Sequence, residues 1–519
     1  MKSNIFRTLL VMTFVLVFVV TASFASSAEM VLRMGRITEP EGFCPHTIGG
    51  RVAREVSAPL YENLIWGDDD GNFHPWVASG WETSDDFTEI TFFIREGINF
   101  HDGTPLNAEA VKFNLERANQ PGNFSADHFP NMTIEVVEEY TVKINLEETY
   151  APFFHNLASR SGGLVSPTAV EKHGGNFYLN PVGSGPFMFE SHTLGAQVVF
   201  VKNPDYVSYH PAVENPGPPH VDRLIYEAIP EETTRSAALT TGGVNIIETG
   251  AVAAMTLRDH PLVYQLDSRA INHNRIGFNM QRPPFDDKLV RMAVAYAVDI
   301  EELGQVAFFD QFTPNRTFIP VDVPGYNAQL GEEYGYFQDQ AKAIELLNEA
   351  GYERGSDGIM RKDGQPLEVT LLTHYAMFTE RAAEAIQSQL AEVGIRVNIS
   401  LMDVGTFLTR GAESETNHFF LIRMTWSDPI LLDTLFLDGG QFDSHTDPVL
   451  DEMLIRAGKE MDWEKRKEIL DEIQIYLLEN AFAVPICSND VIWFARNEVT
   501  GLKFDTQNTM ILNDVKVGE

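Results

Sequence analysis

Segments with helical periodicity alternate with segments of strand periodicity along most of the chain, and this order restricts the fold more than any other feature. In "RAAEAIQSQLAEVGIRVNISLMD", a helical run reaches Gly394 and an alternating strand follows, with apolar side chains at Ile395, Val397, Ile399 and Leu401. A helix that leads into a strand is the repeating unit of an α/β sheet. The sequence therefore predicts a mixed α/β protein, and its 519 residues are enough for two lobes or more.

Residues 108–118, "AEAVKFNLERA", illustrate the helical segments. They place Ala110, Val111, Leu115 and Ala118 near one stripe of a helix. Just before them, "EITFFIREGINF" is rich in residues that favour strands and is followed by the turn-forming "HDGTP". We therefore expect a helix over residues 108–118 that covers a sheet.

The amino terminus has the order of a secretory signal peptide. Lys2 and Arg7 precede an uncharged apolar run over residues 9–20, and small residues then continue to Ala28. A transmembrane anchor is the alternative, but the run is short for a span of about 20 residues. No cysteine follows the run to carry a lipid. We predict that residues 1–28 are removed and that the mature protein is soluble in the periplasm.

The formal net charge is −36, which restricts the partners of the protein. A surface this acidic repels the phosphates of nucleic acids and of anionic lipids. We therefore exclude nucleic acid as a partner. The acidity is otherwise explained by solubility or by a saline habitat.

The common enzyme motifs are absent from the sequence. It contains no Gly-x-x-x-x-Gly-Lys-Ser/Thr loop, no His-Glu-x-x-His, no Cys-x-x-Cys and no Gly-x-Ser-x-Gly. The segment "GDDDGN" does not have the spacing of a calcium loop, and the 14 histidines are scattered. We expect no enzyme activity, no cofactor and no metal site. An exported hydrolase stays as an alternative, because catalytic groups can be distant in sequence.

Several blocks, in order, resemble the extracytoplasmic solute-binding proteins of ABC importers. The resemblance is to family 5, whose members carry peptides, nickel chelates and related solutes. The first block is "PLYENLIWGDDDGNFHPWVASGWETSDDFTEITFFIREGINFHDGTPLNAEAVKFNLER". The blocks that follow are "GSGPFMFES", "VKNPDYVSYHP", "IGFNMQRPPFDDKLVRMAVAYAVD", "AIELLNEAGY", "DGQPLEVTLLT" and "IQSQLAEVGIRVNI".

The resemblance implies two α/β lobes that are joined by two strand crossings and close around a solute. It places lobe one at residues 29–268 plus 480–519, with an extra subdomain inserted at about 74–190, and lobe two at 269–479. It also implies a monomer that delivers a small solute to an ABC permease in the inner membrane. Presentation of the ligand to a chemoreceptor is an alternative role.

The resemblance gives the two cysteines of the chain a place. "FCPH", with Cys44 and His46, and "VPICSND", with Cys487 and Asn489, occupy the positions where relatives bring an amino-terminal strand and a returning strand to the cleft. This suggests that Cys44 and Cys487 are neighbours in lobe one, as a disulfide or a thiol pair. Two unpaired buried cysteines are the alternative. His46 and Asn489 are candidate ligand contacts.

Two further blocks of the resemblance supply candidate ligand residues. In "NLASRSGGLVSP", Arg160 falls where relatives end a strand that points at the cleft, and its guanidinium can grip a carboxylate with two hydrogen bonds. "LIRMTWSDP" resembles a tryptophan block of lobe two. There Trp426 is expected to stack on the ligand, Arg423 to add a second cation, and Asp428 to bind an amino terminus or form a turn.

The solute has two candidate classes. Arginines and a tryptophan suit both a peptide and a metal chelate with carboxylates. The nickel branch of the family often carries an arginine–proline segment where this chain has "SRSGG". We therefore favour di- or oligopeptides, with a nickel or metal chelate as the alternative.

Overall fold

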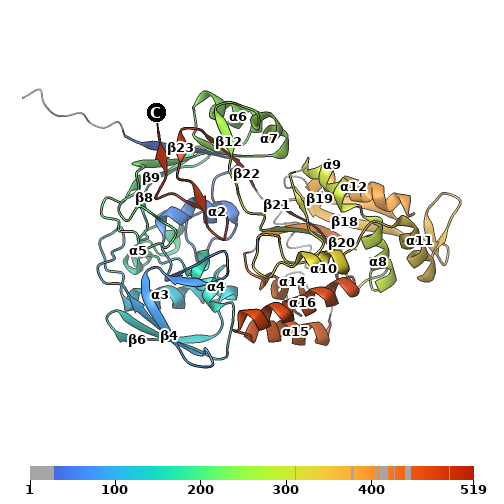
Figure 1. The fold of residues 1–519 in the computed structure, drawn as a ribbon, viewed down its shortest axis with the longest axis horizontal. Helices are drawn as coiled ribbons and strands as arrows, with labels where there is room; N and C mark the ends of the chain where they lie inside the picture. Colours follow the sequence, from blue (N-terminus) through green and yellow to red (C-terminus); the bar gives the residue numbers. More distant parts are fainter. Residues whose placement is uncertain are drawn as a thin grey trace, which may run out of the picture.

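The computed structural model has two lobes, each built on a mixed β-sheet with helices packed against it (Figure 1). The α/β fold class is thus confirmed. Within the described residues, no helix is long and apolar enough to cross a bilayer. The structure describes residues 29–309, 311–375, 379–403, 406–407, 419–425, 427–438, 446–489 and 491–518.

Lobe one is built on a seven-stranded sheet whose central strand comes from the start of the described chain. β1 (Val31–Arg36) lies between β10 (Arg223–Ala228) and β11 (Ile246–Thr249) and runs parallel to both. Leu32 and Met34 alternate into the core beneath the sheet. The outer strands are β8 (Phe187–Thr193), β9 (Gln197–Lys202), β12 (Val263–Gln265) and β22 (Ile492–Arg496), and the helices are α2 (Arg51–Ser57), α5 (Pro167–His173), α6 (Glu232–Thr241) and α7 (Ala251–Leu257).

A smaller unit with its own core is inserted between β1 and β8. α3 (Ala108–Ala118) packs on an antiparallel sheet and buries Ala110, Val111, Leu115 and Ala118, as the periodicity predicted. α4 (Phe153–Ala158) packs on the same core and reaches the cleft described below. The sheet has the order β4-β5-β7-β6, with bounds Ala78–Thr83, Glu89–Ile94, Thr141–Leu146 and Met132–Glu138, and a hairpin of β2 (Ile65–Gly67) and β3 (Phe73–Pro75) precedes it.

Lobe two is built on a six-stranded sheet of order β14-β21-β13-β20-β18-β19. The predicted helix-to-strand unit is α12 (Thr379–Glu392) followed by β19 (Arg396–Met402). Gly394 between them has a φ of 88°, a left-handed conformation that glycine adopts easily. The remaining strands are β13 (Asn272–Phe278), β14 (Thr313–Pro314), β18 (Glu368–His374), β20 (Phe419–Thr425) and β21 (Ala483–Asn489), with a small sheet of β15 (Glu353–Arg354), β16 (Met360–Lys362) and β17 (Gln365–Pro366). The helices are α8 (Lys288–Ala297), α9 (Ile300–Phe308), α10 (Ala328–Glu333), α11 (Gln340–Glu349), α14 (Leu431–Phe436), α15 (Pro448–Lys459) and α16 (Trp463–Glu479).

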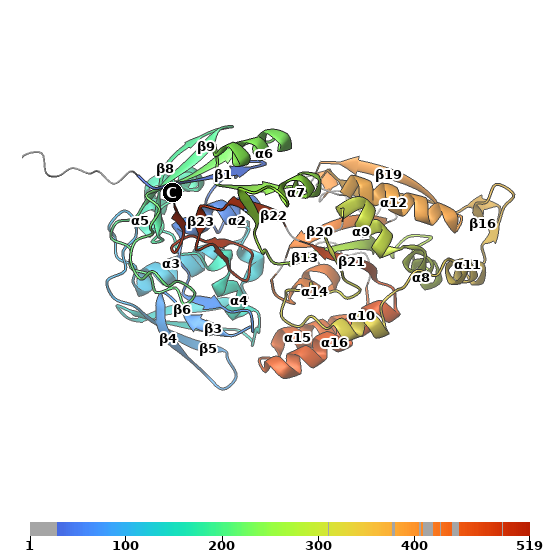
Figure 2. The same ribbon diagram turned by 45° about the horizontal axis from the view of Figure 1, so that its top comes forward.

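The chain crosses between the lobes twice, and both crossings lie near the middle of the molecule (Figure 2). The first lies between β12 and β13, and the second lies between β21 and β22. The second crossing was predicted near residue 480, which is too early. β21 pairs with β13 and β14, so the return to lobe one falls after Asn489.

After the second crossing, the carboxy-terminal segment packs on lobe one. β22 pairs with β11 and β12, and short hairpins follow. The hairpin strands are β23 (Val499–Thr500), β24 (Lys503–Phe504), β25 (Met510–Ile511) and β26 (Lys516–Val517). The turn between β24 and β25 carries Gln507, which faces the cleft.

Candidate ligand-binding cleft

A cavity of about 310 Å³ lies between the two lobes, and we call it the central cavity. Most of its wall comes from lobe one, through α2, α4 and the turn that follows α4. Lobe two contributes Thr425, at the end of β20, and Ser427. The lining residues are Gly50, Arg51, Arg54, Phe124, His128, His155, Asn156, Ser159, Arg160, Ser161, Thr425, Ser427 and Gln507.

Two further cavities adjoin the central cavity. An outer cavity of about 390 Å³ shares His155, Ser427 and Gln507 with it and extends between the lobes towards Asp428 and Arg466. A smaller cavity of about 80 Å³ lies in lobe one, and we call it the lobe-one pocket. It shares Arg54, Arg160 and Gln507 with the central cavity, and it is lined by Pro45, Arg54, Ser57, Ala58, Tyr61, Asn63, Trp66, Trp76, Ala158, Arg160, Gly163, His210, Asp505, Gln507 and Thr509.

Arg160 stands where the central cavity and the lobe-one pocket meet. It follows α4, and the side chain of Ser159 starts its short 3₁₀ turn by accepting from Ser161 N. Arg160 Nη2 donates to the carbonyl oxygen of Cys44 at 3.0 Å, whereas its Nε and Nη1 are buried and have no acceptor among the described residues. Burial, with a smaller contribution from the nearby Arg54, lowers the pKa of Arg160 to about 10. The guanidinium still carries its charge at neutral pH.

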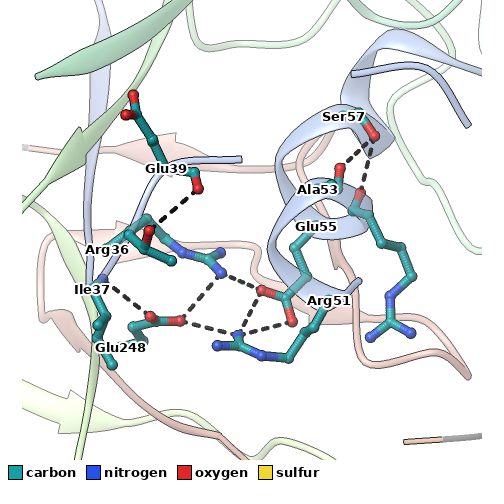
Figure 3. A network of polar contacts seen from close by, with 10 residues as sticks. Arg36, Ile37, Glu39, Arg51, Ala53, Glu55, Ser57 and Glu248 are labelled. Atoms are coloured by element: carbon teal, nitrogen blue, oxygen red, sulfur yellow. Dashed lines mark hydrogen bonds and ion pairs between the residues drawn. The ribbon is translucent and has the colours of Figure 1, made fainter. Parts of the chain in front are cut away.

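Arg51, on the same wall, is in a different state. Its Nη1 lies 2.9 Å from Glu55 Oε2 and 3.0 Å from Glu248 Oε2, and Arg36 binds the same two carboxylates (Figure 3). Burial alone would raise the pKa of Glu248, but Arg36 and Arg51 lower it to about 2. This buried network joins β1, α2 and β11, so the charge of Arg51 is already neutralised inside the protein.

His155 connects the lobes across the cleft. From α4 of lobe one, its Nε2 lies 3.3 Å from Ser427 Oγ and its Nδ1 lies 3.8 Å from Asp428 Oδ2 in lobe two. Burial lowers the pKa of His155, although Asp428 opposes that shift. A backbone hydrogen bond from Ala151 N to Gly458 O, 2.8 Å long, joins the lobes nearby. The lobes are therefore in direct contact beside the central and outer cavities.

Asp428 is buried and is already satisfied within lobe two. Its Oδ1 lies 3.2 Å from Arg466 Nη2 and accepts from Ile430 N at 2.8 Å. Burial raises the pKa of Asp428, but Arg466 and His155 outweigh burial and hold it below its usual value. Asp428 thus forms the turn that the sequence analysis gave as one of its two roles.

The disulfide suggested for Cys44 and Cys487 is wrong, because both residues are free, buried thiols. Cys44 lies in the core of lobe one, where Arg117 Nη2 is 3.7 Å from its Sγ. Cys487 lies on β21 and belongs to the core of lobe two. Pairing of β21 with β13 keeps Cys487 in the other lobe, so the alternative of two unpaired cysteines holds.

The other candidates are distributed over both lobes. His46 is buried beside the lobe-one pocket, with its Nε2 3.0 Å from Gly163 O. Asn489 Oδ1 accepts from Asn274 Nδ2 at 2.7 Å inside the sheet of lobe two. Arg423 lies on β20 opposite Asn274, and it lines none of the three cavities. Trp426 lies outside the described residues.

Several residues that line the cleft were missed by the sequence analysis. No sequence motif is shared by these residues, which are Arg54, Tyr61, His155 and Gln507. His155 stands only five positions before Arg160, so its closeness to that candidate was the one signal available.

Comparisons with known proteins identify the family of this chain. Residues 72–441 match the family described as "Bacterial extracellular solute-binding proteins, family 5 Middle". The glutathione-binding protein GsiB of Shigella flexneri serotype 5b is 31% identical over 376 residues, which cover 72% of this chain and 69% of the relative.

Solved structures share the fold. The periplasmic binding protein DppA of Helicobacter pylori, in complex with the peptide STSA, superposes with a TM-score of 0.78 at 22% identity, covering 94% of this chain and 98% of that one. NikA of Brucella suis, in complex with Fe(III)-EDTA, gives a TM-score of 0.82 at 23% identity, with 94% and 99% covered. The two-lobed architecture is therefore confirmed, and the chain belongs to family 5 of the bacterial extracellular solute-binding proteins, the substrate-binding components of ABC transporters.

Proposed function

We propose that this protein captures di- or oligopeptides between its lobes in the periplasm and delivers them to an ABC permease in the inner membrane. The observation that carries the proposal is Arg160, a buried cation at the central cavity with two nitrogens that have no acceptor among the described residues. Such a group binds a peptide carboxylate through charge-assisted hydrogen bonds. The names of the relatives support a peptide solute, since GsiB is a glutathione-binding protein and DppA was solved with a peptide.

The geometry suggests an order of events. A solute carboxylate first binds Arg160 on lobe one, because most of the cavity wall belongs to that lobe. Lobe two then closes, and the contacts of His155 with Ser427 and Asp428 form across the cleft. Closure removes the solute from water and gives the permease a shape that differs from the empty form.

A metal chelate is the second candidate solute. The comparison that favours it is NikA, which was solved with Fe(III)-EDTA, a chelate rich in carboxylates. His128 and His155 also line the central cavity. Among the described residues, no group of three or more His, Cys, Asp or Glu side chains is placed to hold a metal ion. A metal would therefore enter as a chelate whose carboxylates face Arg160.

A thermal-shift screen separates the two solute classes. The mature protein is unfolded and refolded to remove carried ligand, and is then mixed with di- to hexapeptides, free nickel, nickel–histidine or carboxylate metallophores. A ligand at 100 times its dissociation constant adds about 2.7 kcal/mol of stability, which raises the melting temperature visibly.

We expect a shift with peptides that is lost in Arg160→Ala. The matched control is Arg456→Ala, because Arg456 is exposed on α15 and lines none of the three cavities. If only chelates raise the melting temperature, the solute is a metal chelate and the peptide function is wrong. If peptides still raise the melting temperature of Arg160→Ala, this arginine does not bind the solute.

A further inference from the structure

The lobe-one pocket gathers buried hydrogen-bond donors that have no acceptor among the described residues. Tyr61 lines this pocket and is only 6% exposed, and its buried hydroxyl has no hydrogen-bond partner among the described residues. Arg160 Nε and Nη1 are in the same state, and so is the indole nitrogen of Trp66. Buried donors are normally hydrogen-bonded, and leaving one unbonded costs about 1–3 kcal/mol. A set of them around one small cavity points to an acceptor that arrives with the ligand.

The charge around the pocket specifies that acceptor as an anion. Arg54 and Arg160 both line it and are close enough for each to disfavour the other's charge. The acid in the wall, Asp505, has its Oδ1 occupied by Gln507 N at 2.9 Å and Thr509 N at 2.7 Å, within its own turn. Among the described residues, Arg160 donates to the carbonyl oxygen of Cys44, its Nε and Nη1 have no acceptor, and no carboxylate forms an ion pair with it.

The size and walls of the pocket restrict the anion further. A cavity of about 80 Å³ accommodates a small group and not a whole residue of a peptide backbone with its neighbours. Trp66, Trp76 and His210 form aromatic walls, with ring centroids 5.4 Å apart for Trp66 and His210 and 4.4 Å apart for Trp76 and His210. A flat carboxylate with a short apolar stem matches such a pocket, since the stem packs on the rings while the oxygens meet the donors.

We propose that the lobe-one pocket is a carboxylate subsite, in which Arg160 and the Tyr61 hydroxyl bind an acidic group that projects from the solute out of the central cavity. The proposal rests on the proposed function and narrows it to solutes with a carboxylate on a short stem. All of these donors belong to lobe one. Capture of the acidic group therefore precedes closure and does not depend on lobe two.

Isothermal titration with matched tripeptides tests the subsite. The probes are Ala-Ala-Glu, Ala-Ala-Gln and the carboxy-terminal amide of Ala-Ala-Glu, so that a side-chain carboxylate and a terminal one are distinguished. We expect one of the two amide substitutions to weaken binding by roughly 100-fold, as for the loss of charged hydrogen bonds. Equal affinity for all three probes would overturn the subsite and leave peptide binding in place.

Tyr61→Phe is the sharpest variant, because it removes one oxygen from a buried position and keeps the ring. We expect this substitution to lower the affinity for the acidic probe about 5- to 10-fold. The affinity for the amide probe that lacks the recognised carboxylate should not change. The control is Tyr264→Phe, whose hydroxyl donates to Val499 O elsewhere in lobe one. A loss of the same size for both probes in Tyr61→Phe would mean a purely structural role and would contradict the proposal.

Glutarate and glutaramide test the subsite without any peptide. We expect millimolar glutarate, but not glutaramide, to raise the melting temperature of wild type, and neither to affect Arg160→Gln. If glutarate acts while no tripeptide binds, the subsite stands and the peptide function fails. If neither glutarate nor any tripeptide has an effect, both proposals fail.

Discussion

The two walls of the cleft differ in how their charges are compensated. On lobe one, Arg160 has buried nitrogens without an acceptor among the described residues, and the neighbouring Tyr61 hydroxyl is in the same state. On lobe two, Asp428 is bound by Arg466 and by the backbone of Ile430. The contrast is between a lobe-one wall with an uncompensated cation, which the proposed function assigns to the solute, and a lobe-two wall whose acid is paired and which contacts His155 through Ser427 and Asp428.

The same contrast exists within lobe one, between Arg51 and Arg160. Arg51 is held by two carboxylates in the buried network with Arg36, whereas Arg160 donates, within the described part of the chain, only to a carbonyl oxygen. Removing one partner of a buried ion pair destabilises the fold strongly, because the other charge is left uncompensated. A buried charge that has no partner already lowers the stability of the folded protein. The first arrangement joins β1, α2 and β11, and the second leaves a cation for the carboxylate of the proposed solute.

The largest expected effect follows from this contrast. We expect Glu248→Gln to lower the free energy of unfolding by about 3–5 kcal/mol, because it leaves Arg36 and Arg51 with an incomplete set of carboxylates. Arg160→Met should stay within about 1 kcal/mol of wild type or become more stable, because it removes an uncompensated charge. Urea unfolding of both variants measures this. Equal destabilisation by the two substitutions would contradict the distinction between the arginines.

A smaller effect is expected on the lobe-two wall. Asp428→Asn removes the charged acceptor of Arg466 and should lower the free energy of unfolding by about 2 kcal/mol, the cost of a hydrogen bond to a charged group. Because the carboxylate subsite lies in lobe one, affinities for acidic and amide tripeptides should fall by the same factor. Titration of both probes checks this. A change in the acid-to-amide preference would assign Asp428 a direct part in recognition.

Acidification should affect His46, which is buried beside the lobe-one pocket. Burial, reinforced by Arg117, lowers the pKa of His46 to about 3, so the unfolded chain binds a proton below pH 6.5 that the folded protein does not. The free energy of unfolding that depends on neutral His46 is fully present above pH 6.5. It declines by about 2 kcal/mol between pH 6.5 and pH 5.

The comparison of wild type with His46→Gln isolates that contribution. The pH dependence that Glu62 adds to the stability has the opposite sign. Burial raises the pKa of Glu62 to about 7, so its contribution to the free energy of unfolding declines as pH rises from about 4.5 to 7. Urea unfolding at pH 7 and pH 5 should therefore reveal a loss in wild type that exceeds the loss in His46→Gln by about 2 kcal/mol. An equal loss in both proteins would show that His46 is not kept neutral.

The smallest effect is expected at the exposed edge of the cleft. Lys459 Nζ of lobe two lies 2.6 Å from Glu148 Oε2 of lobe one, and both side chains are about half exposed or more. Such a surface pair contributes at most about 1 kcal/mol and is screened by salt. We expect Lys459→Ala to change tripeptide affinity by no more than about 5-fold, and less at 0.5 M salt. A larger, salt-independent loss would make this pair a principal closing contact.

Local patterns in the sequence were sufficient to predict individual helices and strands and to recognise the family. The helix over residues 108–118 and the unit around Gly394 were predicted correctly, because burial follows the 3.6- and 2-residue periods within one segment. The ordered blocks gave the two-lobed fold. The second crossing was misplaced because sheet pairing of β21 with β13 joins segments about 200 residues apart, and no local period records it.

The candidate site was determined by the sequence only in part. By itself, the sequence established an α/β protein of an importer family, and Arg160 as a candidate contact, from residue order and residue chemistry. Only the tertiary structure decided that Cys44 and Cys487 belong to different lobes, that Asp428 is already paired, and that Tyr61 joins Arg160 around one pocket. The physical reason is that compensation of a buried charge or donor depends on neighbours in space, and those neighbours come from distant segments of the chain.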